Sequence, residues 1–159
     1  MGGTVILAIL PGALALLLVW AGIEDARTRE IADWKNIAIA ALAPLWWWAT
    51  GMALWPDMLL QIGIAAVVFG LFAGVFAFGW MGGGDVKMIG ALALWFPLQP
   101  LVWMLVVMSI AGGVLTVIMV FDSARDRAAP IEVPYGVAIA LAALLALREL
   151  HFNQFGAFI

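Results

Sequence analysis

The sequence contains no cysteine and a single histidine in 159 residues. The missing cysteines exclude disulfides, thiolate zinc sites, iron–sulfur clusters and cysteine nucleophiles, and one histidine is too few for a His-rich metal site. We therefore expect neither a metal nor a cofactor. Charged residues are also scarce, at 11% against roughly 25% in an average soluble domain. The net charge of −3 argues against a nucleic-acid partner.

Hydrophobic residues, by contrast, make up 67% of the chain, and the mean hydropathy is +1.15. A soluble fold of this size cannot cover such a composition with polar surface, so the sequence predicts an integral membrane protein. Because a crossing takes about 20 apolar residues, the apolar runs predict an all-α, polytopic protein with about six transmembrane helices. The expected spans are Thr4–Ile23, Ile37–Trp55, Met58–Trp80, Met88–Phe96, Leu101–Phe121 and a last helix that ends near Leu147.

The fourth apolar run is too short to cross a bilayer as a helix. From Val86 to Phe96 a helix rises only about 16 Å, against roughly 30 Å of hydrocarbon. Either the stretch Pro97–Pro100 completes the crossing in extended form, or Asp85 lies below the membrane surface, or both. Each arrangement places Asp85 close to the apolar layer or inside it.

The basic residues are concentrated in three polar connections. The segments 24–36, 81–87 and 122–133 carry six of the seven Lys and Arg residues, and Arg148 is the seventh. Because positively charged loops face the cytoplasm, the sequence predicts an external N-terminus in a multi-pass protein of the cell (inner, cytoplasmic) membrane. It also predicts that Asp25 and Asp85 lie at the same, cytoplasmic face.

Asp25 and Asp85 are the residues best suited to chemistry. An acid at membrane depth is costly and indicates a functional role. Two carboxyls at one depth can share a proton, so that the neutral one acts as general acid while the ionised one activates water. Glu24 points about 100° away from Asp25 on a helix and is the weaker candidate. Two simpler interpretations stay open: Asp25 in a solvated charge cluster, and Gly82–Gly84 as a hinge before an interfacial acid.

Two further groups of residues have structural interpretations. Trp46, Trp47, Trp48 and Trp55 cluster near the outer end of the second expected span, which is typical of an aromatic belt at the membrane interface. The interleaved acids and bases of Asp122–Glu132 predict a solvated loop.

Three segments carry a resemblance to a known family. They are Asp25–Trp34, Gly82–Met88 with its Gly-Gly-Gly-Asp motif, and Val133–Ala140 with its Pro-Tyr-Gly motif. In this order they resemble the type IV prepilin peptidases, membrane aspartyl proteases of the GxGD kind, and they are similar also to archaeal preflagellin peptidases. The resemblance extends from residue 25 to about residue 140.

The resemblance implies a membrane-embedded aspartic endopeptidase that removes the short basic leader from type IV prepilin precursors at the cytoplasmic face. Asp25 and Asp85 would be its catalytic pair. The residues expected to contact the precursor are Gly82, Gly83, Gly84, Asp33, Lys87, Pro134, Tyr135 and Gly136. The expected partners are a precursor with one hydrophobic helix and a basic leader, and the lipid bilayer.

The size of the chain refines this expectation. Larger members of the family carry an extra cytoplasmic domain, often with paired cysteines, that is tied to N-methylation of the cleaved pilin. This sequence resembles the short form that serves Flp (tight-adherence) pili, so residues 1–159 are expected to form a single transmembrane peptidase domain without a separate methyltransferase or soluble domain. Two other functions stay open: a small ion- or proton-coupled transporter that uses the Asp pair, and a non-catalytic secretion or pilus assembly subunit.

Overall fold

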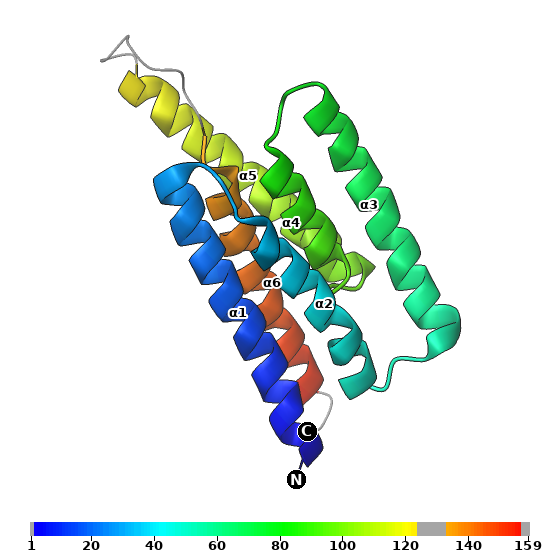
Figure 1. Ribbon diagram of the computed structural model, residues 1–159. Helices are drawn as coiled ribbons and strands as arrows, with labels where there is room; N and C mark the ends of the chain where they lie inside the picture. The colour runs from blue at the N-terminus through cyan, green and yellow to red at the C-terminus, as the bar shows by residue number, and fades with distance from the viewer. Residues whose placement is uncertain (1, 124–132, 157–159) are drawn as a thin grey trace.

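The computed structural model describes residues 2–123 and 133–156, and within these ranges the chain is helical, without a β-strand (Figure 1). This confirms the expected all-α class. The elements are α1 (Gly2–Thr28), α2 (Asp33–Ala49), the short π-helical turn η1 (Leu54–Met58), α3 (Leu59–Ala77), α4 (Gly83–Ala93), α5 (Leu98–Ser123) and α6 (Tyr135–Gly156). Residues 124–132 of the expected charged loop lie outside the described residues.

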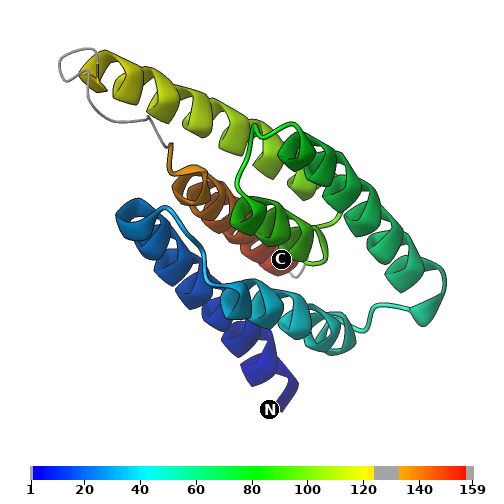
Figure 2. The same ribbon diagram turned by 45° about the horizontal axis from the view of Figure 1, so that its top comes forward.

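The helices form an elongated bundle in which α4 has a central position. It packs against α2, α3 and α6, while α1 packs against α2 and α6. Figure 1 shows the α1–α2 and α3–α4 connections at one end of the bundle, and the start of α1 at the other end. Figure 2 shows α3 at the edge of the bundle, away from α1. The segments with the predicted functional residues are therefore gathered at one end.

Among the residues that the structure describes, three helices are long and apolar enough to cross a membrane by length and composition. These segments are Val5–Thr28, Leu54–Ala77 and Leu98–Phe121, each of 24 residues. Large apolar side chains such as Leu16, Leu71 and Ile110 are exposed on them, as expected where lipid rather than water surrounds a helix. The structure thus supports a membrane protein with at least these candidate spans, and the total of about six stays a prediction.

The short fourth helix ends inside the bundle because side chains satisfy its last carbonyl groups. Trp47 Nε1 donates a hydrogen bond to the Leu94 carbonyl oxygen at 2.8 Å. Gln61 Nε2 donates to the carbonyl oxygens of Ala93 at 2.6 Å and Phe96 at 2.7 Å. Unpaired carbonyls are costly where water is excluded, so these two side chains allow α4 to stop after 11 residues.

Two sequence-based boundaries need correction. The stretch Pro97–Pro100 does not continue the crossing in extended form, because α5 begins at Leu98. Pro100 is tolerated there since the first turn of a helix has backbone N–H groups without intrahelical partners. The last helix also continues past the expected end near Leu147, to Gly156.

The predicted aromatic belt is wrong for two of its four tryptophans. Trp46 and Trp47 are 6% and 5% exposed and belong to the core, whereas Trp48 and Trp55 are exposed. The ring of Trp46 stacks on Trp95, with centroids 5.8 Å apart. A buried tryptophan can donate its indole N–H to a backbone carbonyl inside the bundle. A Trp-rich segment can therefore pack in the core as well as lie at the membrane interface.

Candidate active site

Asp25 and Asp85 meet at one cleft although they come from separate helices. Asp25 lies in the last turns of α1, and Asp85 lies in the first turn of α4. Their side chains are only 4% and 8% exposed. Both residues line two cavities of about 500 and 230 Å³, and these cavities share Gly82 as well. The burial contradicts the interpretation of Asp25 as a member of a solvated charge cluster.

The carboxylate of Asp25 is held by the start of α6. The backbone N–H of Val137 donates to Asp25 Oδ2 at 3.1 Å and also approaches the Pro134 carbonyl oxygen at 3.2 Å. Gly136 makes this contact possible, because a Cβ atom there would lie 2.7 Å from Asp25 Cγ. Backbone N–H groups in the first helical turn have no intrahelical partner and favour a negative charge. The Pro-Tyr-Gly segment therefore positions one acid of the pair.

Asp85 has a different environment, at the polar start of α4 and outside the three candidate spans. Burial raises the pKa of its carboxyl to about 7, and the nearby charge of Asp25 acts in the same direction. A Cβ atom on Gly82 would lie 3.1 Å from Asp85 Oδ2, so the first glycine of the motif leaves room for this carboxyl. A carboxyl that is neutral near pH 7 can donate a proton, as a general acid does.

The connection between α1 and α2 packs closely on the start of α4. Arg29, four residues after Asp25, adopts a positive φ of 60° directly after the end of α1 at Thr28. A Cβ atom on Gly84 would lie 3.3 Å from Ile31 Cβ and 3.4 Å from the Ile31 carbonyl oxygen. The space beside Gly84 is thus occupied by the protein itself, in addition to any role in contacting a substrate.

A buried ion pair that sequence reasoning missed fixes the same connection. The Lys35 side chain is 1% exposed, and its Nζ pairs with Glu24 Oε2. The Nζ atom lies 4.7 Å from the ring centroid of Trp20 and 5.6 Å from that of Trp34. Glu24 Oε2 also accepts a hydrogen bond from the Ala32 N–H at 3.1 Å. The sequence signal for this ion pair was the spacing of Trp20 and Glu24, which lie one helical turn apart and so on the same face of α1.

Asn36 is a second residue that the sequence did not reveal. Its side chain is 4% exposed, and its Nδ2 donates to the Gly84 carbonyl oxygen at 3.1 Å. Its Oδ1 has no partner among the described residues. This hydrogen bond ties the first turn of α2 to the glycine motif.

The other predicted site residues are divided between the cleft and its neighbourhood. Tyr135 lines the larger cavity, and Gly83, Gly84 and Asp33 line the smaller one. Lys87 lines neither, and instead forms an exposed ion pair with Asp33 at 2.7 Å. Within residues 2–123 and 133–156, no three His, Cys, Asp or Glu side chains are placed to hold a metal ion.

Comparisons with known proteins find relatives of this chain. The model of the type IV leader peptidase family matches residues 12–117, more than half of the chain. A prepilin leader peptidase/N-methyltransferase from Xanthomonas campestris pv. campestris is 31% identical over 135 residues, which cover 84% of this chain. The chain spans 40% of the length of that relative. No solved structure matches the chain.

Proposed function

Because this chain belongs to the type IV leader peptidase family, we propose that it is an aspartic endopeptidase with Asp25 and Asp85 as its catalytic pair. The observation that carries the proposal is that these two buried acids, from α1 and α4, line the same cleft. The cleft is largely polar where they meet, since Thr28, Arg29 and Glu30 also line it. Water and an extended peptide can therefore reach carboxyl groups that are otherwise enclosed by the bundle.

The environments of the two acids suggest their roles. Asp25, which accepts the Val137 N–H, acts as the base: it takes a proton from water as the hydroxyl oxygen adds to the carbonyl carbon. Asp85, whose pKa is raised, is the acid and gives its proton to the carbonyl oxygen. When the C–N bond breaks, Asp25 gives its proton to the amide nitrogen and Asp85 takes a proton back from one of the two hydroxyl groups on the carbon, so that both acids return to their starting states. These steps use only the two carboxyl groups and one water molecule.

We propose as substrate a type IV, Flp-like prepilin precursor with a short basic leader and one hydrophobic helix. The cleft is lined by residues at the α1–α2 and α3–α4 connections, and Figure 1 shows these connections at one end of the bundle. The segments around these connections carry Arg27, Arg29, Lys35 and Lys87, which favours the cytoplasmic side of the inner membrane. A leader that stays in the cytoplasm then reaches the acids directly.

The proposal is limited to hydrolysis. The relative is named for an N-methyltransferase activity as well, but in this chain only residues 29–32 separate α1 from α2. The paired cysteines that larger members often carry are absent from the sequence. We therefore propose a peptidase without methyl transfer.

Co-expression with a precursor tests the function. Wild type should convert a precursor with a basic leader into a shorter product on a gel, and mass spectrometry should place the cut at the leader. Asp85→Asn, present in the membrane at equal amount by immunoblot, should leave the precursor intact. Equal conversion by the variant, or no conversion of any such precursor by wild type, would contradict the proposal.

A further inference from the structure

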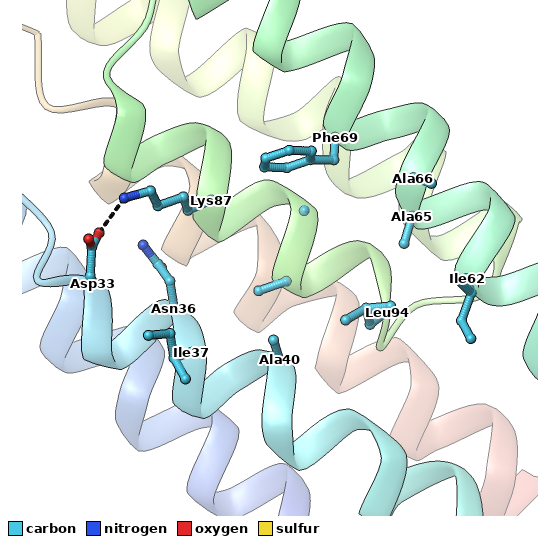
Figure 3. A pocket seen from close by; sticks show the side chains of 12 residues that line it. Asp33, Asn36, Ile37, Ala40, Ile62, Ala65, Ala66, Phe69, Lys87 and Leu94 are labelled. Atoms are coloured by element: carbon cyan, nitrogen blue, oxygen red, sulfur yellow. Dashed lines mark hydrogen bonds and ion pairs between the residues drawn. The ribbon is translucent and has the colours of Figure 1, made fainter.

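A third cavity, of about 460 Å³, opens between α2, α3 and α4. Figure 3 shows α4 between the other two helices, with Lys87 beside Asp33 at one end of this groove and Leu94 towards the other end. From Lys87 to Leu94 a helix rises about 10 Å, or two turns. Apart from the polar end, the lining is apolar, and it includes the exposed Ile37 and Ile62.

The groove exists because α3 packs on α4 rather than on α2. In Figure 1, α3 stands at the edge of the bundle, and its main neighbours are α4 and η1. Gly90 sets the closest approach, since a Cβ atom there would lie 2.6 Å from Phe69 Cδ2. The walls also carry small side chains such as Ala40 and Ala66, among larger ones such as Ile62. Small residues let helix backbones approach closely in a membrane.

We propose that this groove receives the hydrophobic helix of the precursor. This docking site rests on the proposed function. The groove is continuous with the catalytic cleft. Asp33 lines both the groove and the smaller cavity that contains Asp25 and Asp85. A helix in the groove therefore begins beside the cleft, and the extended segment before it reaches Asp85 without crossing another helix.

Charge complementarity at the polar end supports the same docking. Asp33 pairs with Lys87, but the two side chains are 63% and 50% exposed. An exposed ion pair contributes little, so a leader cation can replace Lys87 at Asp33 at little cost. The acidic Glu30 lies on the wall of the adjoining cavity. An apolar helix preceded by a basic segment therefore matches the groove from end to end, whereas a lipid chain matches only its apolar part.

Disulfide cross-linking tests the docking directly, because the chain has no cysteine of its own. Ala66→Cys places a thiol in the groove, and Val67→Cys places one on an exposed position of the same helix that does not line it. Both are made in the Asp85→Asn variant, which keeps the precursor intact, and the precursor carries one Cys in the first turns of its helix. A disulfide requires Cα atoms within about 7 Å, so oxidation should link the precursor to Ala66→Cys and several-fold less to Val67→Cys.

Equal linkage at both positions, or none at Ala66→Cys, would overturn the docking. If the unmodified chain still cleaves the precursor in that case, the catalytic proposal stands and the precursor helix binds elsewhere than in this groove. If it cleaves no precursor, the proposed function fails first. The two failures are thus separated by one additional assay.

A kinetic measurement provides a second test of the docking. Ala66→Trp fills the groove and should raise KM for the precursor about tenfold, a moderate effect for an overpacked contact, with kcat little changed. Such a split indicates lost binding rather than lost chemistry. Val67→Trp should leave both constants as they are. An unchanged KM in Ala66→Trp would overturn the proposal.

Discussion

The backbone N–H of Val137 donates a hydrogen bond to Asp25 Oδ2 at 3.1 Å and so joins the first turn of α6 to the end of α1. The contact depends on Gly136, the neighbouring residue, which has no side chain to displace the carboxylate. A motif near the C-terminus therefore sets the position of an acid near the N-terminus. The proposed chemistry depends on packing between distant segments as much as on the two acids themselves.

Gly136→Ala should reduce cleavage strongly. The added Cβ would lie 2.7 Å from both Asp25 Cγ and Ile31 Cδ1, so the carboxylate must move. A displacement of about 1 Å can cost about 100-fold in rate. The matched control is Gly113→Ala in α5, where a Cβ would meet nothing within 4 Å. Rates for both purified variants decide the matter, and equal rates would show that the α6 contact does not position Asp25.

Asp25→Asn and Asp85→Asn should each abolish cleavage while the protein remains folded in the membrane. Either change removes one member of a proton-sharing pair. Asp→Glu should also be poorly tolerated at both positions, because the extra methylene moves the carboxyl by about 1 Å. Asp57→Asn is the control, since this acid is exposed in η1 and lines none of the three cavities. Full activity of Asp25→Asn on the gel would rule out the dyad.

Cleavage should fall as the pH rises above 7. Burial raises the pKa of Asp85 to about 7, so its carboxyl is neutral and able to donate a proton below that pH and is ionised above it. With one proton required, the rate should drop about tenfold per pH unit on the alkaline side. Leader lysines stay charged until about pH 10, so the substrate is unchanged over this range. A rate that is constant from about pH 6 to about pH 9 would mean that Asp85 is not the acid.

The sequence was sufficient for features that depend on composition and local pattern. The all-α class follows from long apolar runs, and the pairing of Asp25 with Asp85 at one end follows from alternating crossings of the chain. These features require no knowledge of which side chain meets which.

Other features depend on contacts between helices that no single-chain pattern specifies. Glu24 and Lys35 lie in a charged stretch of the sequence, which indicates solvent exposure, yet they form a buried ion pair. The rings of Trp20 and Trp34, which flank the Lys35 ammonium, are brought together only by the α1–α2 turn. The end of α4 inside the bundle likewise depends on Gln61 of α3. Periodicity and spacing describe one helix at a time.

Removing the Glu24 carboxylate should destabilise the protein, although the sequence indicated this residue only as the weaker candidate for a catalytic acid. Glu24→Gln leaves the buried Lys35 ammonium uncompensated. We expect a loss of about 2–3 kcal/mol in the free energy of unfolding, below the usual range for a buried pair because Glu24 is 29% exposed. Thermal unfolding in detergent measures it.

Two variants serve as controls for this prediction. The double variant Glu24→Leu/Lys35→Met should regain most of the stability, since replacing both charges leaves none unpaired. Asp33→Asn, which breaks the exposed pair with Lys87, should cost less than about 1 kcal/mol. If Glu24→Gln loses no more free energy of unfolding than Asp33→Asn, then the buried Lys35 ammonium does not need the Glu24 carboxylate for stability.

Reporter fusions should give a cytoplasmic position for the end of the bundle that holds Asp25 and Asp85. Fusions after Trp55 and after Gln99 should read as external, because each follows a crossing that starts at the acidic cleft, and a fusion after Arg127 should read as internal. The basis is that six of the seven Lys and Arg residues lie in the segments 24–36, 81–87 and 122–133, which favours retention of these segments inside.

A matched variant in which Gln replaces Arg27 and Arg29 should weaken this preference, because it removes two of the six cations that hold these segments inside. An internal signal after Trp55 in the unmodified chain would place α1 and α2 on a different path through the membrane. The cleft would then not face the compartment that holds a cytoplasmic leader, and the proposed substrate would be wrong even if the two acids were catalytic.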